Sequence, residues 1–226
     1  MSEIRFDAVR HAYGERSVLT GIDLTLTEQR IGIIGANGSG KSTLSRMING
    51  LVTPTSGTVT VDGLDTARKG RQVRRTVGFV FTDPDHQIVM PTVSEDIAFS
   101  LRRSGLSKAE RADRVAGVLA DFGLSGHADH PTHLLSGGQK QLLALAAVMV
   151  TEPDVIVADE PTTLLDLRNA RLMRRTLAGL RQQLVVVTHH LDLLDDFDRV
   201  VVIDSGTVAA DGPPRESIAF YRDLIG

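Results

Sequence analysis

A glycine-rich stretch, GANGSGKST over residues 35–43, has the residue types that bind a triphosphate and lies between an apolar segment and a helical pattern. Glycines let the backbone curl so that its amides face an anion, and the start of a helix adds unpaired N–H groups and a positive dipole end. Lys41 supplies a mobile cation, and Ser42 supplies a hard oxygen ligand for magnesium. We predict a triphosphate site here, against the alternative of a turn that only joins a strand to a helix. The residues expected to contact the nucleotide are Gly35, Asn37, Gly38, Ser39, Gly40, Lys41, Ser42 and Thr43.

A second apolar segment, VIVADE over residues 155–160, ends in two carboxylates. Successive residues of a strand point to opposite sides, so Asp159 and Glu160 can have different roles. Asp159 can hold the magnesium shell while Glu160 faces the γ-phosphate and polarises the attacking water. An apolar strand that ends in Asp-Glu is weak evidence alone, but beside a phosphate loop it becomes strong evidence for hydrolysis.

A third motif, LSGGQ over residues 135–139, precedes a helical pattern that continues to residue 150. Ser136 is a suitable N-cap, and Gly137 and Gly138 leave the amides of the first turn bare. This second helix start is either an ordinary helix cap or a second binding surface for the nucleotide. In the second case the nucleotide can be one that is bound to another subunit.

The composition limits the class of protein. The chain has 226 residues, a net charge of −3 and no cysteine, which excludes disulfides, thiolate zinc sites and cysteine nucleophiles. This charge gives no general attraction for nucleic acid. The longest apolar run, residues 142–150, is far shorter than the roughly 20 residues of a membrane span, and the N-terminus lacks the pattern of a signal peptide. We therefore expect a cytoplasmic α/β protein whose membrane role, if it has one, depends on a partner.

The order of the expected elements indicates an α/β fold with a helical insertion. Residues 1–30 alternate as β structure, whereas residues 94–101 and 107–122 have helical spacing and no strand-like segment occurs from residue 82 to residue 153. We expect one domain over residues 1–226, in which residues 1–81 and 154–226 form a β subdomain and the nucleotide-binding core, and residues 82–153 form a helical subdomain. The basic segment 68–75 is expected to be a solvated loop.

The three motifs, together with EPTTLLD at residues 160–166 and VVVTHH at residues 185–190, resemble those of the ATP-binding-cassette (ABC) ATPases in order and spacing. The resemblance covers essentially the whole chain. It implies a P-loop (RecA-like) nucleotide-binding core with an N-terminal antiparallel β subdomain and an inserted helical subdomain. It also implies that two subunits sandwich two ATP molecules, so that residues 136–139, the signature, act in trans.

The resemblance assigns roles around the nucleotide. Tyr13 matches the aromatic residue that stacks on adenine, with packing in a hairpin as the alternative. Ser42 and Asp159 match the positions that hold Mg²⁺, and Glu160 matches the general base. His189 matches the switch histidine that touches the γ-phosphate. The catalytic residues are therefore expected to be Glu160, His189 and Lys41.

Two further positions depend on the resemblance. Asp166 matches the aspartate of the loop that contacts the second subunit. The family's glutamine that reaches toward magnesium and the attacking water is replaced here by Thr82. Threonine keeps a hydroxyl but loses about two bonds of reach, so any contact would need a bridging water. His190 stands where aspartate is more usual.

Residues 82–99, TDPDHQIVMPTVSEDIAF, resemble the corresponding stretch of energy-coupling-factor importers for cobalt, biotin and other vitamins. In that group a short glutamine-containing helix lies beside the transmembrane coupling protein. The chain also stops soon after residue 214, which resembles the biotin-importer subunit. The resemblance implies an ATPase homodimer at the cytoplasmic face of the membrane, peripheral to a coupling protein and a substrate-binding membrane protein. Cobalt, nickel or another vitamin is the alternative cargo.

Other functions remain alternatives. One is a soluble ABC ATPase acting on DNA or ribosomes, but chromosome-type members carry a long coiled coil and translation-type members carry two cassettes, and neither feature is present here. Another is a small-molecule phosphotransferase, which leaves LSGGQ and the switch histidine unexplained. ATP binding without turnover is disfavoured by Glu160. Residues 127–133, HADHPTH, offer metal-ligand types, but Pro131 and the position just before the signature favour a connecting loop.

Overall fold

The computed structural model describes all 226 residues, and the chain forms two compact units. The first unit consists of Met1–Gly78, Asp154–Glu160 and Arg181–Gly226, and the second consists of Phe79–Pro153 and Pro161–Leu180. The second unit thus contains residues 161–180, which the sequence analysis grouped with the core. The reason is that helix α6 (Leu167–Ala178) contacts helix α5 (Gly137–Met149) within that unit.

An antiparallel sheet forms the N-terminal part of the first unit. Its strand order is β2 (Arg16–Leu26), β1 (Ile4–Tyr13), β4 (Ser56–Val61) and β5 (Leu64–Asp65). Alternate residues of β1 and β2 are buried, as expected for a sheet with one face on the core. The predicted β subdomain is present.

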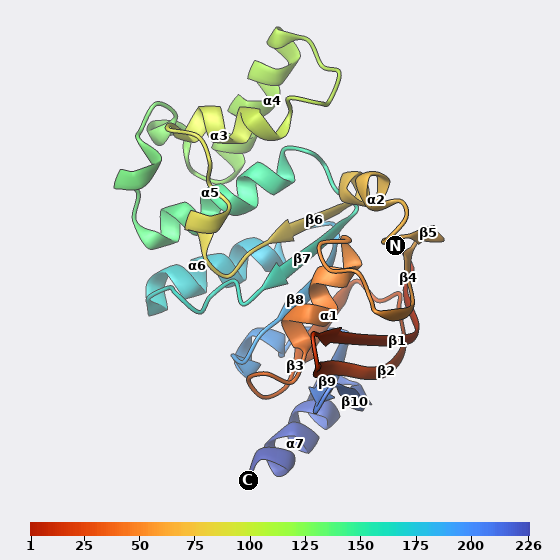
Figure 1. Cartoon of the computed structure of the whole chain (residues 1–226). Helices are drawn as coiled ribbons and strands as arrows, with labels where there is room; N and C mark the ends of the chain where they lie inside the picture. Colours follow the sequence, from red (N-terminus) through yellow and green to blue (C-terminus); the bar gives the residue numbers. More distant parts are fainter. The chain divides into compact units, whose positions relative to one another are not determined.

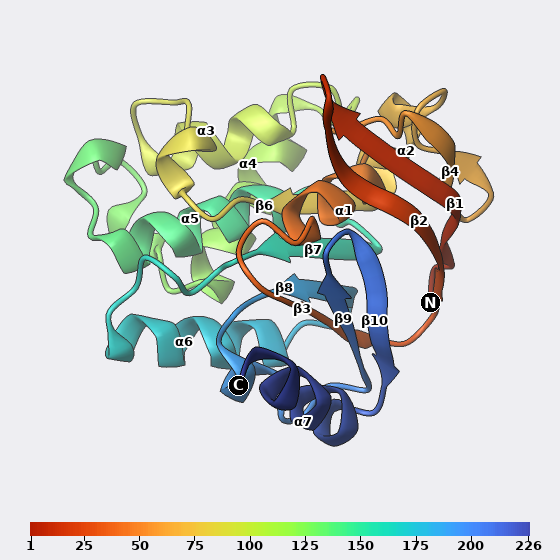
Figure 2. The same ribbon diagram turned by 60° about the horizontal axis from the view of Figure 1, so that its bottom comes forward.

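The first unit also contains a mostly parallel sheet (Figure 2). Its order is β10 (Thr207–Gly212), β9 (Arg199–Asp204), β3 (Arg30–Ile34), β8 (Gln183–Val187), β7 (Val155–Asp159) and β6 (Val77–Val80), of which β6 continues into the second unit. Strands β7 and β8 are buried throughout because parallel sheets are covered on both faces. The carboxyl ends of β3, β8 and β7 therefore lie next to one another.

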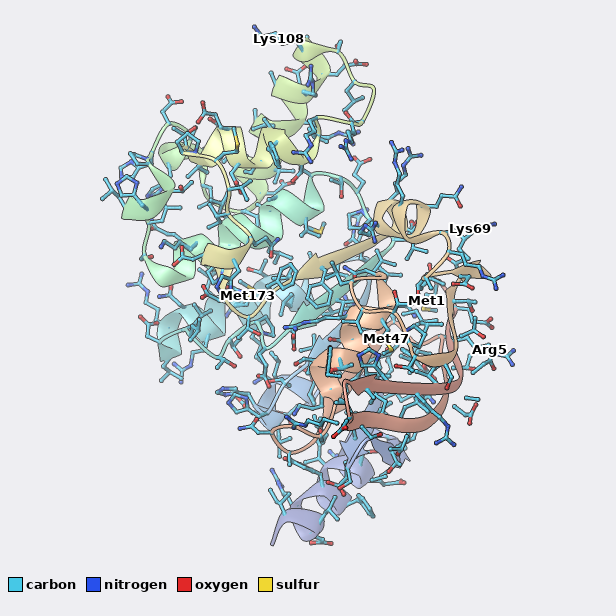
Figure 3. The ribbon with its side chains drawn as sticks, viewed as in Figure 1. Met1, Arg5, Met47, Lys69, Lys108 and Met173 are labelled. Atoms are coloured by element: carbon cyan, nitrogen blue, oxygen red, sulfur yellow. The ribbon has the colours of Figure 1, made fainter.

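Helices cover this sheet. Helix α1 (Lys41–Ile48) follows β3, and its Met47, labelled in Figure 3, is fully buried. Helix α7 (Pro214–Ile225) packs on β9 and β10 through Ile218 and Tyr221. Helix α2 (Gly70–Thr76) occupies the basic segment, so the expectation of a loop there is wrong. Its Val73 is buried, and that single apolar residue anchors the helix among the arginines.

The second unit is helical (Figure 1). Helix α5 is buried along most of its length and contacts α3 (Val93–Ser100), α4 (Lys108–Asp121) and α6. Short 3-10 helices connect these elements; they are η1 (Pro84–His86), η2 (Ser125–His127) and η3 (Thr132–Leu134), while η4 (Leu191–Leu194) lies in the first unit. None of the helices has the length and apolar character needed to cross a membrane.

Candidate nucleotide-binding site

The glycine-rich loop between β3 and α1 has a backbone that only glycine permits. Gly35 has φ 150°, and a Cβ on it would lie 2.0 Å from the carbonyl oxygen of Ile203. Gly40 has φ 106°, and a Cβ there would lie 2.7 Å from Leu19 Cδ2. The loop therefore packs against the ends of neighbouring strands, and this packing holds its amides in place.

The start of α1 is open to a ligand. Gly40 is its N-cap and provides no side chain to accept from the first-turn N–H groups. Lys41 is only 6% exposed, and its Nζ donates to the carbonyl of Ala36 at 2.9 Å. Burial lowers the pKa of Lys41, while the charges of Glu160 and Asp159 oppose that shift. A lysine in this position is available for an anion in place of the carbonyl of Ala36.

A cavity of about 360 Å³ lies over this loop. It is lined by Tyr13, Arg16, Val18, Asn37, Gly38, Gly40, Lys41, Ser42, Thr43 and Glu160. Tyr13 is 53% exposed and meets His11 edge to face, with ring centroids 4.6 Å apart. Its exposed ring is free to stack on a base. Arg16 was not predicted from the sequence, although its place directly after the turn that follows Tyr13 was a signal.

Asp159, at the end of β7, is held on both oxygens. Its Oδ1 accepts from the Ser42 hydroxyl at 2.9 Å, and its Oδ2 pairs with Arg46 at 3.3 Å. Burial raises the pKa of Asp159, and Ser42 and Arg46 oppose that rise. Ser42 and Arg46 lie one helical turn apart on α1, so this spacing could have identified Arg46 from the sequence. The hydroxyl and the carboxylate are hard oxygen donors, and this pair fits Mg²⁺.

Glu160 is directed into the cavity by an unusual backbone conformation. Its φ is 52°, in the left-handed region, and its N–H donates to the carbonyl of Val187 at 2.8 Å. Its Oε2 lies 2.8 Å from Nδ1 of His189, which follows β8. Because β7 and β8 are parallel neighbours, their carboxyl ends bring these two residues together. The residues that sequence reasoning named for hydrolysis thus meet in one place in the first unit.

The second unit contains the LSGGQ motif at the start of α5. Ser136 is the N-cap: its Oγ accepts from Gln139 N at 3.3 Å, and Gln139 Oε1 accepts from Ser136 N at 2.9 Å. This reciprocal capping box satisfies part of the first turn. Gly137 follows the cap and has open space beside it. A Cβ at this position would meet no atom closer than the Leu164 carbonyl oxygen, at 4.0 Å.

Gly138 lies against the loop that contains Asp166. A Cβ on Gly138 would lie 2.3 Å from Asn169 Cγ, so the glycine allows a close approach of the two segments. Asn169 donates to both oxygens of Asp166, from its N at 2.8 Å and from Nδ2 at 3.1 Å. Asp166 is the N-cap of α6. Sequence reasoning named Gly138 and Asp166 separately and missed Asn169, which connects them.

Thr82 also lies in the second unit, directly after a residue whose backbone is held on both sides. Phe81 N donates to Gln87 Oε1 at 3.1 Å, and Gln141 Nε2 donates to Phe81 O at 3.2 Å. Gln87 is the glutamine of residues 82–99, where a glutamine-containing helix was expected, but these backbone contacts of the two glutamines were not predicted. Among His, Asp and Glu side chains, no group of three or more in the chain is placed to hold a metal ion, and this includes residues 127–133.

The fold and this site define a P-loop α/β nucleotide-binding protein. The chain matches the ABC transporter family model over residues 19–163. A putative ABC transporter ATP-binding protein of Deinococcus radiodurans is 52% identical over 225 residues, which cover 100% of this chain and 99% of that protein. The biotin transport ATP-binding protein BioM of Rhizobium etli is 48% identical over 221 residues, 98% of each chain.

Among solved structures, cbiO1 of Clostridium perfringens, part of the ABC transporter complex cbiONQ, matches with a TM-score of 0.85 and 33% identity. The match covers 98% of this chain and 92% of that chain. The chain belongs to the ABC transporter family as an ATP-binding protein. It is an ATPase, as the motifs indicated, and the predicted fold class is confirmed.

Proposed function

We propose that this protein is the ATP-hydrolysing subunit of an energy-coupling-factor importer that carries biotin. The observation that supports hydrolysis is the contact between Glu160 and His189 at the edge of the phosphate-loop cavity. The cargo assignment rests on the likeness to a biotin transport ATP-binding protein over nearly the full length of both chains. Residues 82–99 support the importer type, since they contain the short helix η1, whose C-cap is Gln87, where a glutamine-containing helix is expected beside a coupling protein.

ATP would bind in the first unit. Tyr13 would stack on the adenine, and the open amides at the start of α1 would surround the phosphates. Lys41 would exchange its contact with the Ala36 carbonyl for the terminal phosphates. Ser42 and Asp159 would hold Mg²⁺, which when bound neutralises charge on the phosphates.

Glu160 and His189 would carry out the chemistry. Glu160 would accept a proton from the attacking water, and its turned backbone directs the carboxylate into the cavity. His189 uses Nδ1 toward Glu160, which leaves Nε2 as the ring atom for the γ-phosphate. Thr82, in the usual position of glutamine, would reach the water only through another water molecule.

We propose that the working form is a homodimer. The nucleotide on the first unit of one copy would meet Ser136, Gly137, Gly138 and Gln139 of the other copy, with Asp166 at the contact between copies. ATP binding would thus close two subunits, and hydrolysis would release them. The dimer would lie at the cytoplasmic face of the membrane beside a coupling protein and a substrate-binding membrane protein, with no nucleic-acid partner.

Purification of the tagged chain from membranes of its native cells tests this proposal. We expect two kinds of integral membrane protein to co-purify and the reconstituted complex to accumulate biotin when ATP is supplied. The Lys41→Ala variant is the control, which should co-purify with the same partners but transport nothing. Recovery of nucleic acid without membrane proteins would overturn the importer assignment, and uptake of cobalt instead of biotin would overturn the cargo.

A further inference from the structure

The carboxamide of Gln139 makes two contacts that fix its orientation. Its Oε1 accepts from Ser136 N at 2.9 Å, as part of the capping box of α5. Its Nε2 therefore points the other way and lies 2.9 Å from Nε2 of His127. A carboxamide nitrogen only donates hydrogen bonds, so His127 Nε2 must be the acceptor.

This contact determines the tautomer of His127. A neutral imidazole that accepts on Nε2 carries its proton on Nδ1. His127 Nδ1 is buried and has no hydrogen-bond partner. Its ring meets His130 edge to face, with centroids 5.5 Å apart. Leaving a buried donor unpaired costs free energy, so local stability alone does not account for this arrangement.

The backbone around His127 is fixed by the start of α3. The Ala128 carbonyl accepts from Ser94 N at 2.8 Å, and the His130 carbonyl accepts from Val93 N at 3.2 Å. The imidazole thus projects from a segment whose backbone is held at Ala128 and at His130. Because this segment is anchored, His127 Nε2 is held where the carboxamide nitrogen of Gln139 can donate to it.

We propose that His127 is a positioning residue for the signature, which holds the carboxamide of Gln139 in the orientation that closes the capping box. Rotated by half a turn, the amide would place its NH₂ against Ser136 N–H, two donors facing each other, and the box would open. The Ser136 N–H selects against that rotation, and the acceptor at His127 adds a second hydrogen bond to the orientation that Ser136 requires. The effect on ATP hydrolysis rests on the proposed role of residues 136–139 on the nucleotide of a second copy.

The first test is the tautomer itself, in the full chain without nucleotide. Nitrogen NMR of ¹⁵N-histidine-labelled protein should show a neutral imidazole protonated on Nδ1 that disappears in the His127→Gln variant, while the signal of His189, whose Nδ1 faces the Glu160 carboxylate, remains. A neutral His127 protonated on Nε2 would overturn the inference. This measurement does not depend on dimerisation, hydrolysis or transport.

The second test compares two variants in the complex with its membrane partners. His127→Leu removes the acceptor, and we expect kcat to fall about three- to tenfold, the range that one lost hydrogen bond produces. The KM for ATP should change less than twofold, because the phosphate loop of the other copy binds the nucleotide. His127→Gln keeps a carbonyl acceptor and should restore most of kcat, and His130→Leu, which removes only the neighbouring ring, should match the wild type.

An unchanged kcat in His127→Leu, or an equal loss in His127→Gln, would overturn the positioning role. The Glu160→Gln background separates this inference from the proposed function. If that variant forms no dimer with ATP, the sandwich itself is overturned. If that variant dimerises, and if adding His127→Leu leaves the ATP concentration needed for dimerisation unchanged, only the role of His127 is overturned. If His127→Leu fails to fold, the tautomer of His127 in the wild type and the kcat of His127→Gln still test the positioning role.

Discussion

Two helices of this protein begin at glycine-rich motifs, and their first turns differ in how their N–H groups are satisfied. Helix α1 begins after Gly40, which has a left-handed backbone and, being glycine, no side chain to cap the helix. Helix α5 begins after Ser136, which forms a closed capping box with Gln139. The N–H groups at the start of α1 are left for a ligand, whereas those at the start of α5 are partly satisfied within the chain.

The charges next to the two helix starts differ in the same way. Lys41 at the start of α1 donates to the carbonyl of Ala36, and a phosphate can replace that contact. Lys140 at the start of α5 forms an ion pair with Asp85 at 2.7 Å. The first terminus thus has uncapped N–H groups and a lysine that can serve an anion within one chain. The second is a capped helix start, which we propose acts on the nucleotide of another copy.

The largest expected effect comes from Glu160→Gln, which tests whether both termini hold the same nucleotide. Loss of the general base should reduce ATP hydrolysis about 100- to 10,000-fold while ATP remains bound. ATP should then trap a closed dimer, which steady-state hydrolysis and light scattering with and without ATP will detect. Normal hydrolysis by this variant would place the base at another residue.

The next effect concerns α1 alone. Lys41→Ala removes a charged donor, and we expect the affinity of the isolated chain for ATP to fall about 10- to 100-fold, as measured by calorimetry. Lys140→Ala is the matched control at α5, because its charge is already paired with Asp85, and it should leave that affinity unchanged. Equal losses in the two variants would contradict the distinction between the termini.

A smaller effect is expected for α5. Ser136→Ala opens the capping box and should destabilise the protein by about 1 kcal/mol, which lowers Tm by about 2–4 °C. The ATP affinity of the isolated chain should equal that of the wild type, while ATP turnover by the dimer should fall several-fold. Reduced ATP binding in the monomer would show that α5 contacts the nucleotide of its own chain.

The smallest effect is expected at a residue that belongs to neither terminus. Thr82→Gln restores the reach of the glutamine that is usual in the family, so we expect ATP turnover, or its coupling to transport, to change several-fold. Thr82→Ser, which keeps the short hydroxyl, is the control. Unchanged hydrolysis and transport in the reconstituted complex would show that this position does not act on the reacting groups.

Local motifs made much of the site predictable. The phosphate loop and the capping box each lie within one continuous segment, so residue spacing is enough to indicate them. Partners distant in sequence were missed, as with Arg46 beside Asp159 and Asn169 beside Gly138. Helix α2 was missed because one buried residue, Val73, anchors it, and one apolar residue produces no detectable periodicity.

The sequence by itself determined the family, the α/β class and the chemistry of each motif, because glycine, lysine and carboxylate at short spacing have few physical uses. Only the tertiary structure decided which groups meet. Ser42 reaches Asp159 across 117 residues because β3, β8 and β7 are neighbours in a parallel sheet and end at the same edge. The contact of His127 with Gln139 likewise depends on α3, which holds one segment against the other.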